Sequence, residues 1–225
     1  MNLLNEFLFF LQVLIVVVFT LIALRAHKAA LGSFIALCFV LANLFVVKQI
    51  DLFGLTVTAS DVFAIGAILG LNLMQEYFGK EEAQKTVRLG FLALIFFGIM
   101  TQVHLAYTPS LVDTTHSSFV AIFSSTPRIL MASFLVYYLV QKWDIWFFQR
   151  LQEWCKGKKW GLRLFLSLFV SQAMDTVLFS FLGLYGLVDS LFDIIVMSYA
   201  VKCAIILLSS PIALFSKRWV RREVT

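Results

Sequence analysis

The sequence of residues 7–24 is FLFFLQVLIVVVFTLIAL, which contains no charged side chain. A helix needs about 20 predominantly apolar residues to cross the hydrocarbon core of a bilayer. Comparable apolar runs, separated by polar breaks, predict further spanning helices at about 31–50, 60–78, 89–107, 119–140, 163–187 and 191–215. We therefore expect an all-α polytopic membrane protein with about seven transmembrane helices.

The composition of the whole chain favours the same class. Of the 225 residues, 61% are hydrophobic and 14% are charged, whereas soluble domains average about 45–50% apolar and about 25% charged residues. Transmembrane β-strands would alternate polar and apolar residues, but the apolar runs here are continuous. The composition excludes a sizeable soluble domain.

Two segments depart from a simple spanning helix. Polar residues flank the third expected span: Thr56, Thr58, Ser60 and Asp61 lead into it, and residues 72–76 end it. A re-entrant or partly extended segment is therefore an alternative there. The longest loop, from Lys142 to Arg163, contains four tryptophans among its basic residues. That mixture predicts a helix lying at the membrane interface.

Most of the basic residues lie in every second connection between the expected spans or near the C-terminus. Fifteen of the 18 Lys and Arg residues lie in the connections near 25–28, 80–88 and 142–163 or near the C-terminus. Since Lys and Arg are enriched in cytoplasmic loops, we expect the N-terminus outside and the C-terminus in the cytoplasm. The basic loops are then explained by topology, and the net charge of +5 does not indicate a nucleic-acid partner.

Ionisable and amide side chains at bilayer depth need a reason, because each charged one costs at least about 2.5–3.5 kcal/mol. The expected spans carry a set that could converge on a central polar cavity, and we take these residues as candidate substrate-binding residues: Asn43, Asn72, Glu76, Arg128, Gln172, Asp175 and Lys202. Asn72 and Glu76 are four residues apart and share one helix face. Structural alternatives remain for Glu76 as a solvated helix end, for Arg128 as an ion-pair partner of an acid, and for Lys202 as the counter-charge of Asp175.

Catalytic and cofactor motifs are absent from the sequence. The three histidines are scattered, no His-Glu-x-x-His zinc motif occurs, and no phosphate-binding glycine loop or Gly-x-Ser-x-Gly elbow is present. The three cysteines have no metal-binding or disulfide spacing. We expect no enzyme, metal or cofactor, and any active transport would use an ion gradient or a partner ATPase.

Six short motifs occur in an order that resembles the queuosine precursor transporter family, also called the vitamin uptake transporter family. They cover about residues 35–215 and are Leu41-Ala-Asn-Leu through Lys48-Gln49, Asn72-Leu-Met-Gln-Glu-Tyr-Phe-Gly-Lys80, Pro127-Arg128-Ile-Leu-Met-Ala-Ser133, Asp144-Ile-Trp-Phe-Phe-Gln-Arg150, Ser171-Gln-Ala-Met-Asp-Thr176 and Tyr199-Ala-Val-Lys202. The chain departs from the family at Asn72, where many members carry an acid.

The resemblance implies a bacterial inner-membrane importer of 7-deazaguanine bases (preQ0, preQ1 or queuine) for tRNA modification. It also implies a single transporter domain over 1–225, in which 1–30 is an additional N-terminal helix, 31–215 a core bundle and 216–225 a cytoplasmic basic tail. That core of six helices would be similar to the substrate-binding subunits of energy-coupling-factor transporters.

The chemistry of a 7-deazaguanine matches the polar set. One carboxylate, from Asp175 or Glu76, could accept the N1–H and 2-amino donors, and Arg128, Asn43 or Gln172 could donate to O6. Two readings stay open: a stand-alone importer, for which no partner ATPase is expected, and a substrate-binding subunit that depends on such a partner. An intramembrane enzyme would need a catalytic constellation that the sequence lacks. The sequence does not indicate the oligomeric state.

Overall fold

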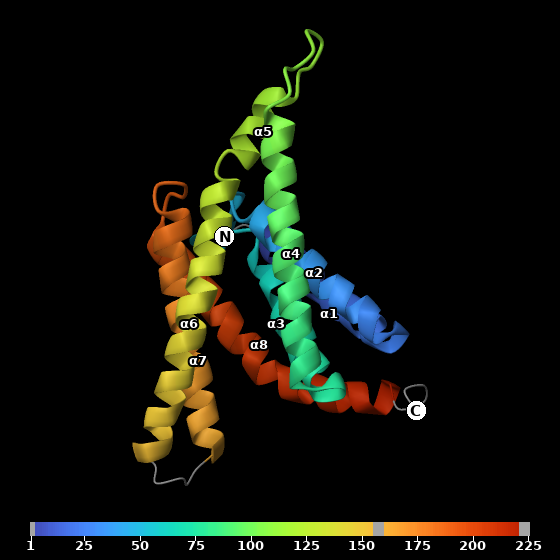
Figure 1. Cartoon of the computed structure of the whole chain (residues 1–225), viewed down its shortest axis with the longest axis vertical. Coiled ribbons are helices and arrows are strands. Elements are labelled where there is room, and N and C mark those ends of the chain that lie inside the picture. Colours follow the sequence, from blue (N-terminus) through green and yellow to red (C-terminus); the bar gives the residue numbers. More distant parts are fainter. Residues whose placement is uncertain (1–2, 155–159, 221–225) are drawn as a thin grey trace.

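The computed structural model describes the backbone of residues 3–154 and 160–220. Side chains are described for all of these residues except 144–145, 148–149, 151–154, 160–165, 167 and 209–220. The chain is almost entirely helical (Figure 1). Its elements are α1 (Leu3–Ala26), α2 (Lys28–Phe45), β1 (Gln49–Leu52), β2 (Leu55–Thr58), α3 (Asp61–Phe78), α4 (Lys80–Leu105), α5 (His116–Phe123), α6 (Thr126–Trp154), α7 (Trp160–Phe179), the π-helix η1 (Ser180–Leu184) and α8 (Leu191–Val220).

Long apolar helices confirm the polytopic membrane class. Within the described residues, five segments are long and apolar enough to cross a membrane: Leu3–Ala26, Lys28–Phe45, Lys80–Leu105, His116–Trp143 and Leu191–Leu208. The third expected span corresponds to α3, which carries polar residues at both ends. The sixth corresponds to α7 with η1, which together contain the shorter apolar segment Leu168–Leu184. α3 lies in the middle of the bundle, whereas α7 packs against α6 and α8 at its side.

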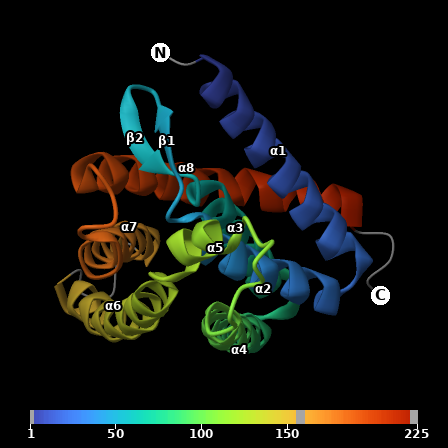
Figure 2. The same cartoon turned by 90° about the horizontal axis from the view of Figure 1, so that it is seen from above.

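The first four helices form one half of the molecule, with α1 packed on α2 and α3. Figure 2 shows α1 and the α6–α7 pair on opposite sides of α3. Close contact between helices depends on small residues, because a Cβ atom at Gly66 of α3 would lie 2.7 Å from Val16 Cγ1 and 2.9 Å from Cys38 Sγ. Similarly, a Cβ atom at Gly90 of α4 would lie 2.2 Å from the Phe39 ring on α2.

A two-stranded antiparallel hairpin interrupts the helices, with Gln49 opposite Thr58 and Leu52 opposite Leu55. Phe53 and Gly54 both have positive φ, as a two-residue type I′ turn requires. The prediction of one helix over 31–50 was therefore wrong at its end, since α2 stops at Phe45. The alternative of an extended segment before the third span was right. Periodicity alone could not place this boundary, because Val46–Val47 is as apolar as the helix before it.

The fifth expected span, 119–140, is divided at Ser124–Ser125 into α5 and α6. Pro127 lies in the first turn of α6, where a missing N–H breaks no helical hydrogen bond. The separate interface helix predicted between Lys142 and Arg163 is not found in the described part, because α6 continues to Trp154; residues 155–159 lie outside the description. Of the expected basic tail 216–225, residues up to Val220 belong to α8.

Candidate functional site

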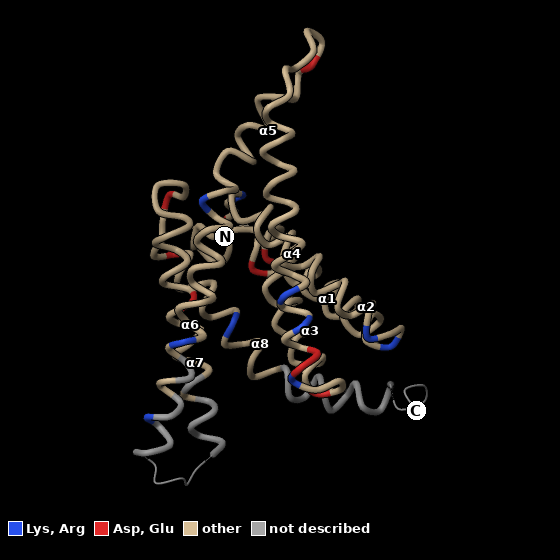
Figure 3. The backbone as a smooth tube through the Cα atoms, in the orientation of Figure 1, with Lys and Arg blue, Asp and Glu red and all other residues tan. Residues whose placement is uncertain are grey.

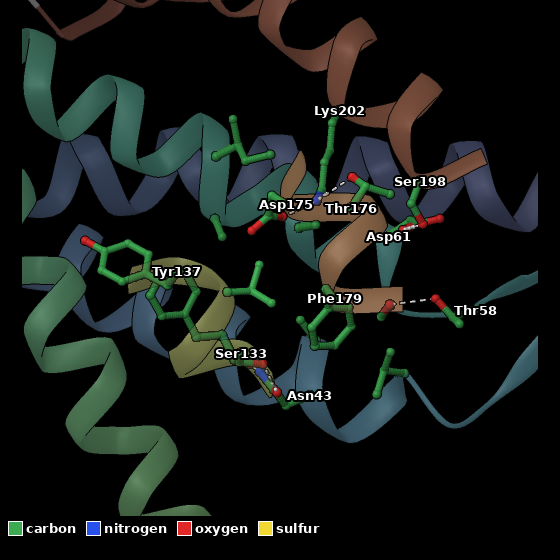
Figure 4. Close-up of a pocket in the computed structure, with 18 of the residues that line it drawn as sticks. Asn43, Thr58, Asp61, Ser133, Tyr137, Asp175, Thr176, Phe179, Ser198 and Lys202 are labelled. Atoms are coloured by element: carbon green, nitrogen blue, oxygen red, sulfur yellow. Dashed lines mark hydrogen bonds and ion pairs between the residues drawn. The ribbon is translucent and has the colours of Figure 1, made fainter. Parts of the chain in front are cut away.

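A cavity of about 320 Å³ lies between α2, α3, α4, α6, α7 and α8 (Figure 4). This volume falls at the lower end of the range of about 300–1,000 Å³ that is typical of small-molecule sites. Its wall is mainly apolar, with polar side chains at a few positions: Asn43, Thr58, Ser60, Asp61, Ser133, Tyr137, Gln172, Asp175, Thr176, Ser180, Ser198 and Lys202. An apolar cavity with a few converging polar groups is the usual form of a binding site for a small organic molecule.

An ion pair between α7 and α8 forms one side of the cavity (Figure 4). The Lys202 ammonium donates to Asp175 Oδ2 at 2.5 Å and to Thr176 Oγ1 at 3.0 Å. Thr176 in turn donates to the carbonyl oxygen of Gln172. The Lys202 side chain is 14% exposed and that of Asp175 is 35% exposed, so the carboxylate is both neutralised by its partner and open to a ligand.

Asn43 on α2 faces Ser133 on α6 across the cavity wall (Figure 4). The Ser133 hydroxyl lies 3.1 Å from Asn43 Oδ1, and Asn43 Nδ2 donates to the Phe39 carbonyl oxygen at 2.9 Å. These bonds fix the orientation of the amide, which offers both a donor and an acceptor to the cavity.

Aromatic rings form another part of the wall. Phe91 of α4 packs edge-on against Tyr137 of α6, with ring centroids 4.6 Å apart, and it also contacts Phe39 at 6.2 Å. Phe179 of α7 lines the cavity as well. The wall can therefore offer a flat ligand both ring faces and ring edges.

Asp61, which we did not predict as a site residue, lies at the start of α3 and lines the cavity. Its side chain is 6% exposed, and Oδ1 accepts a hydrogen bond of 2.7 Å from the Ser198 hydroxyl on α8. We interpreted Asp61 only as part of the polar lead-in to a span. The spacing of Ser198 and Lys202, four residues apart and hence on one face of α8, was the feature in the sequence that could have drawn attention to this face.

Arg128 lies elsewhere, in the first turn of α6 and exposed. Its Nε donates to the Leu182 carbonyl oxygen at 3.0 Å and its NH2 to the Tyr185 carbonyl oxygen at 2.7 Å. Those carbonyls belong to the end of the helix formed by α7 and η1, which lacks helical partners for its last carbonyl groups. Arg128 is thus placed to hold this helix end and is not among the residues that line the cavity.

Asn72 and Glu76 are also not among the lining residues, and both are exposed. Ile68, which does line the cavity, is followed at intervals of four residues by Asn72 and Glu76, so the three share one face of α3. The structure therefore brings four predicted residues together (Asn43, Gln172, Asp175 and Lys202) and leaves Asn72, Glu76 and Arg128 outside the cavity.

Comparisons with known proteins agree with a transport role. A family model described as "Putative vitamin uptake transporter" matches residues 58–216, which include every wall of the cavity except α2. A protein of Bacillus subtilis (strain 168) named "Probable queuosine precursor transporter" is 30% identical over 223 residues, which is 97% of this chain and 97% of the relative. No solved structure matches the chain significantly.

Proposed function

The chain belongs to the vitamin uptake transporter family, and from this membership we propose that it imports queuosine precursors, the 7-deazaguanine bases preQ0, preQ1 or queuine, for tRNA modification. It is a multi-pass membrane transporter and not an enzyme. The observation that carries the proposal is the similarity to the Bacillus protein along nearly the whole of both chains. The cavity of about 320 Å³ supports it, because a small flat base fits a site of this kind.

Asp175 is our choice for the guanidine-like edge of the base. The N1–H and 2-amino donors lie side by side, so one carboxylate can accept both, and Asp175 is the acid with the more exposed side chain in the cavity. The ammonium of Lys202 would then neutralise the bound carboxylate and stand near O6. Glu76 remains a site for an inward stage of transport, since it continues the cavity-facing stripe of α3.

Asn43 and Gln172 are proposed as further donors to the base. Each amide can donate to O6 and also accept from a ring N–H. Phe91, Tyr137 and Phe39 would contact the plane of the base. Asn72, one turn beyond Ile68, would meet the C7 substituent as the base leaves the cavity, and Arg128 would act as a positioning residue.

The orientation that we propose is N-terminus outside and C-terminus in the cytoplasm of a bacterium's inner membrane. Figure 3 shows Lys and Arg at the junction of α1 with α2, in the first part of α4 and on the lower part of α6, which are the connections that we expect in the cytoplasm. The residues that line the cavity come from the opposite ends of α2, α3 and α8, near the hairpin. A cavity near the outer side suits capture of a base from outside the cell. We further propose that 31–215 forms the transporting core and that α1 is an addition to it.

Complementation tests this function. The chain is expressed in a bacterium that cannot make queuosine precursors and lacks its own importer, each base is supplied at nanomolar concentration, and queuosine is measured in tRNA. We expect restoration by at least one base, and loss of restoration in Asp175→Asn at equal membrane abundance. Failure with all three bases would contradict the proposal. Restoration only when an energy-coupling ATPase complex is co-expressed would instead identify a substrate-binding subunit.

A further inference from the structure

Asp61 separates two cavities. The first is the central one, and the second, of about 200 Å³, lies between α1, the hairpin and the start of α3. Among the described residues, only Thr58 and Asp61 line both cavities. The second cavity is on the hairpin side, where its polar wall is made by Asn5, Gln12 and Lys48. Thr58 and Asp61 therefore stand between the two cavities, and Asp61 is the ionisable residue of the two.

The carboxyl group of Asp61 has an unusual set of contacts for a buried acid. Oδ1 accepts from Ser198, whereas Oδ2 is buried and has no hydrogen-bond partner among the described residues. No salt bridge to Asp61 is formed within the same part of the chain; by contrast, Asp175 in the same cavity is paired with Lys202. A buried unpaired polar atom costs about 1–3 kcal/mol. Among the described residues, Asp61 and Glu6 each carry such a carboxylate oxygen, and of these two acids only Asp61 lines the cavities.

The charged side chains on the segments that surround Asp61 come from three helices and from the residue before β1. Lys202 and Asp193 lie on α8, Asp175 on α7, Glu6 on α1, and Lys48 before β1. Lys202 is occupied by Asp175, Asp193 accepts from the Thr56 amide, and Glu6 accepts from the Phe53 amide. In the described part of the chain, α2 and α4 contribute no charged side chain to either cavity.

Two opposed influences act on this carboxyl group. Burial disfavours the carboxylate form, whereas the hydrogen bond from the Ser198 hydroxyl and the positive charge of Lys202 favour it. A carboxyl group held in this way can take up a proton when water from one side reaches it and release the proton when the other side opens. Protonation would also place a hydrogen on Oδ2, which has no hydrogen-bond partner among the described residues as a carboxylate oxygen. The neutral acid could then donate a hydrogen bond from this oxygen.

We propose that Asp61 is a proton-binding site that couples import to proton entry, an inference that rests on the proposed transport function. A proton from the outside reaches the Asp61 carboxylate through the second cavity and converts it to the neutral acid. The neutral acid and the bound base then move to the inward-open state together. There the O–H bond breaks, the proton goes to cytoplasmic water, and the carboxylate is restored.

Vesicles that contain the purified full-length chain test the coupling. The probe is radiolabelled preQ0, which is neutral, or whichever base restores queuosine in the complementation experiment. With the outside one pH unit more acidic and the membrane potential held at zero by a potassium ionophore, one proton per base would drive about tenfold accumulation, since one pH unit is a tenfold ratio in proton concentration, or about 1.4 kcal/mol. We expect Asp61→Asn to abolish this accumulation and to retain exchange of labelled for unlabelled base within about twofold.

Matched variants separate coupling from structural damage. Asp189→Asn changes an exposed acid in the loop before α8 and should keep both accumulation and exchange. Ser198→Ala keeps the Asp61 carboxyl group but removes its hydrogen bond, and should shift the pH at which accumulation is half-maximal. If Asp61→Asn does not fold, the wild-type vesicles still give an answer, because addition of the base must make a lightly buffered outside medium more alkaline.

The outcomes are distinct. Wild-type exchange without a response to the pH gradient, accumulation driven by a sodium gradient alone, or pH-driven accumulation in Asp61→Asn would each overturn the proton site and leave the transport function standing. Absence of exchange in the wild type with all three bases would overturn the transport function, and the proton site with it.

Discussion

Lys202 and Asp175 form an ion pair across the α7–α8 contact, inside a cavity whose wall is mostly apolar. Both residues were predicted from the sequence as intramembrane charges, and the structure places them in contact. Each limits the cost of burying the other. The pair also leaves Asp175 partly exposed, so that a ligand can share the carboxylate with Lys202.

Single substitutions at this pair should damage stability and transport, and the double substitution should separate the two effects. Lys202→Met leaves an uncompensated carboxylate in an apolar wall, and Asp175→Asn leaves an uncompensated ammonium. We expect both single variants to unfold at lower temperature in detergent and to lose at least about tenfold in uptake, or about 1.4 kcal/mol. The double variant should recover most of the thermal stability and none of the uptake. Full uptake by the double variant would remove Asp175 from the site.

The 2-amino group of the substrate should decide selectivity. If one carboxylate accepts both N1–H and the 2-amino group, a 7-deazapurine without that amino group leaves a carboxylate oxygen unpaired in a water-poor site. A penalty of about 1–3 kcal/mol corresponds to weaker competition by about fivefold to 150-fold. Competition of unlabelled analogues against uptake of the labelled base measures this ratio. Equal competition by both analogues would show that the guanidine-like edge is not bound by an acid.

Arg128 should act through the helix that it holds. Arg128→Gln removes two hydrogen bonds to the carbonyl oxygens of Leu182 and Tyr185, at the end that precedes α8. We expect uptake to fall several-fold and thermal stability to fall with it, while the ranking of the three bases is unchanged. Arg128→Lys should rescue only in part, because an ammonium cannot reproduce the fork of a guanidinium. Lys80→Gln, an exposed change at the α3–α4 junction, is the control. A changed ranking of the bases would place Arg128 at the substrate.

The predictions from sequence were most accurate where a single physical preference dominates. Continuous apolar runs have one good solution in a bilayer, the helix, and the runs were found at nearly their observed positions. The hairpin at 49–58 was anticipated only as an alternative, because the apolar run before it was extended to residue 50; the alternation of polar and apolar residues in 49–52 and 55–58 is the strand signal in the sequence. The division of α5 from α6 at Ser124–Ser125 was missed, since two serines within an apolar run are tolerated in spanning helices.

The residues that line the cavity were anticipated in part, because burial can be inferred from the sequence only where apolar residues flank the polar one on both sides. Asp175 and Lys202 are flanked by apolar residues on both sides, so their burial could be inferred from the chain alone. Asp61 stands at the start of its apolar run, where an acid is usually solvated, and only the hairpin and Ser198 around it reveal its burial. Arg128 was misjudged in the opposite direction, because its distance from the loop was counted along a helix that α5 and α6 do not form continuously.

Contact between α1 and α3 should depend on the absence of a side chain at Gly66. A Cβ atom there would lie within 3 Å of Val16 and Cys38, and overpacking of this kind costs about 1–3 kcal/mol. Gly66→Ala should therefore lower the unfolding temperature, and the added change Val16→Ala should restore part of the loss. Gly32→Ala in α2 is the matched control, because a Cβ atom there would be 3.7 Å from its nearest neighbour, Thr86 Oγ1. Since alanine favours a helix over glycine by about 1 kcal/mol, this control should be neutral or more stable. A loss of stability in the control equal to that of Gly66→Ala would show that the effect comes from the glycine backbone and not from the α1–α3 contact.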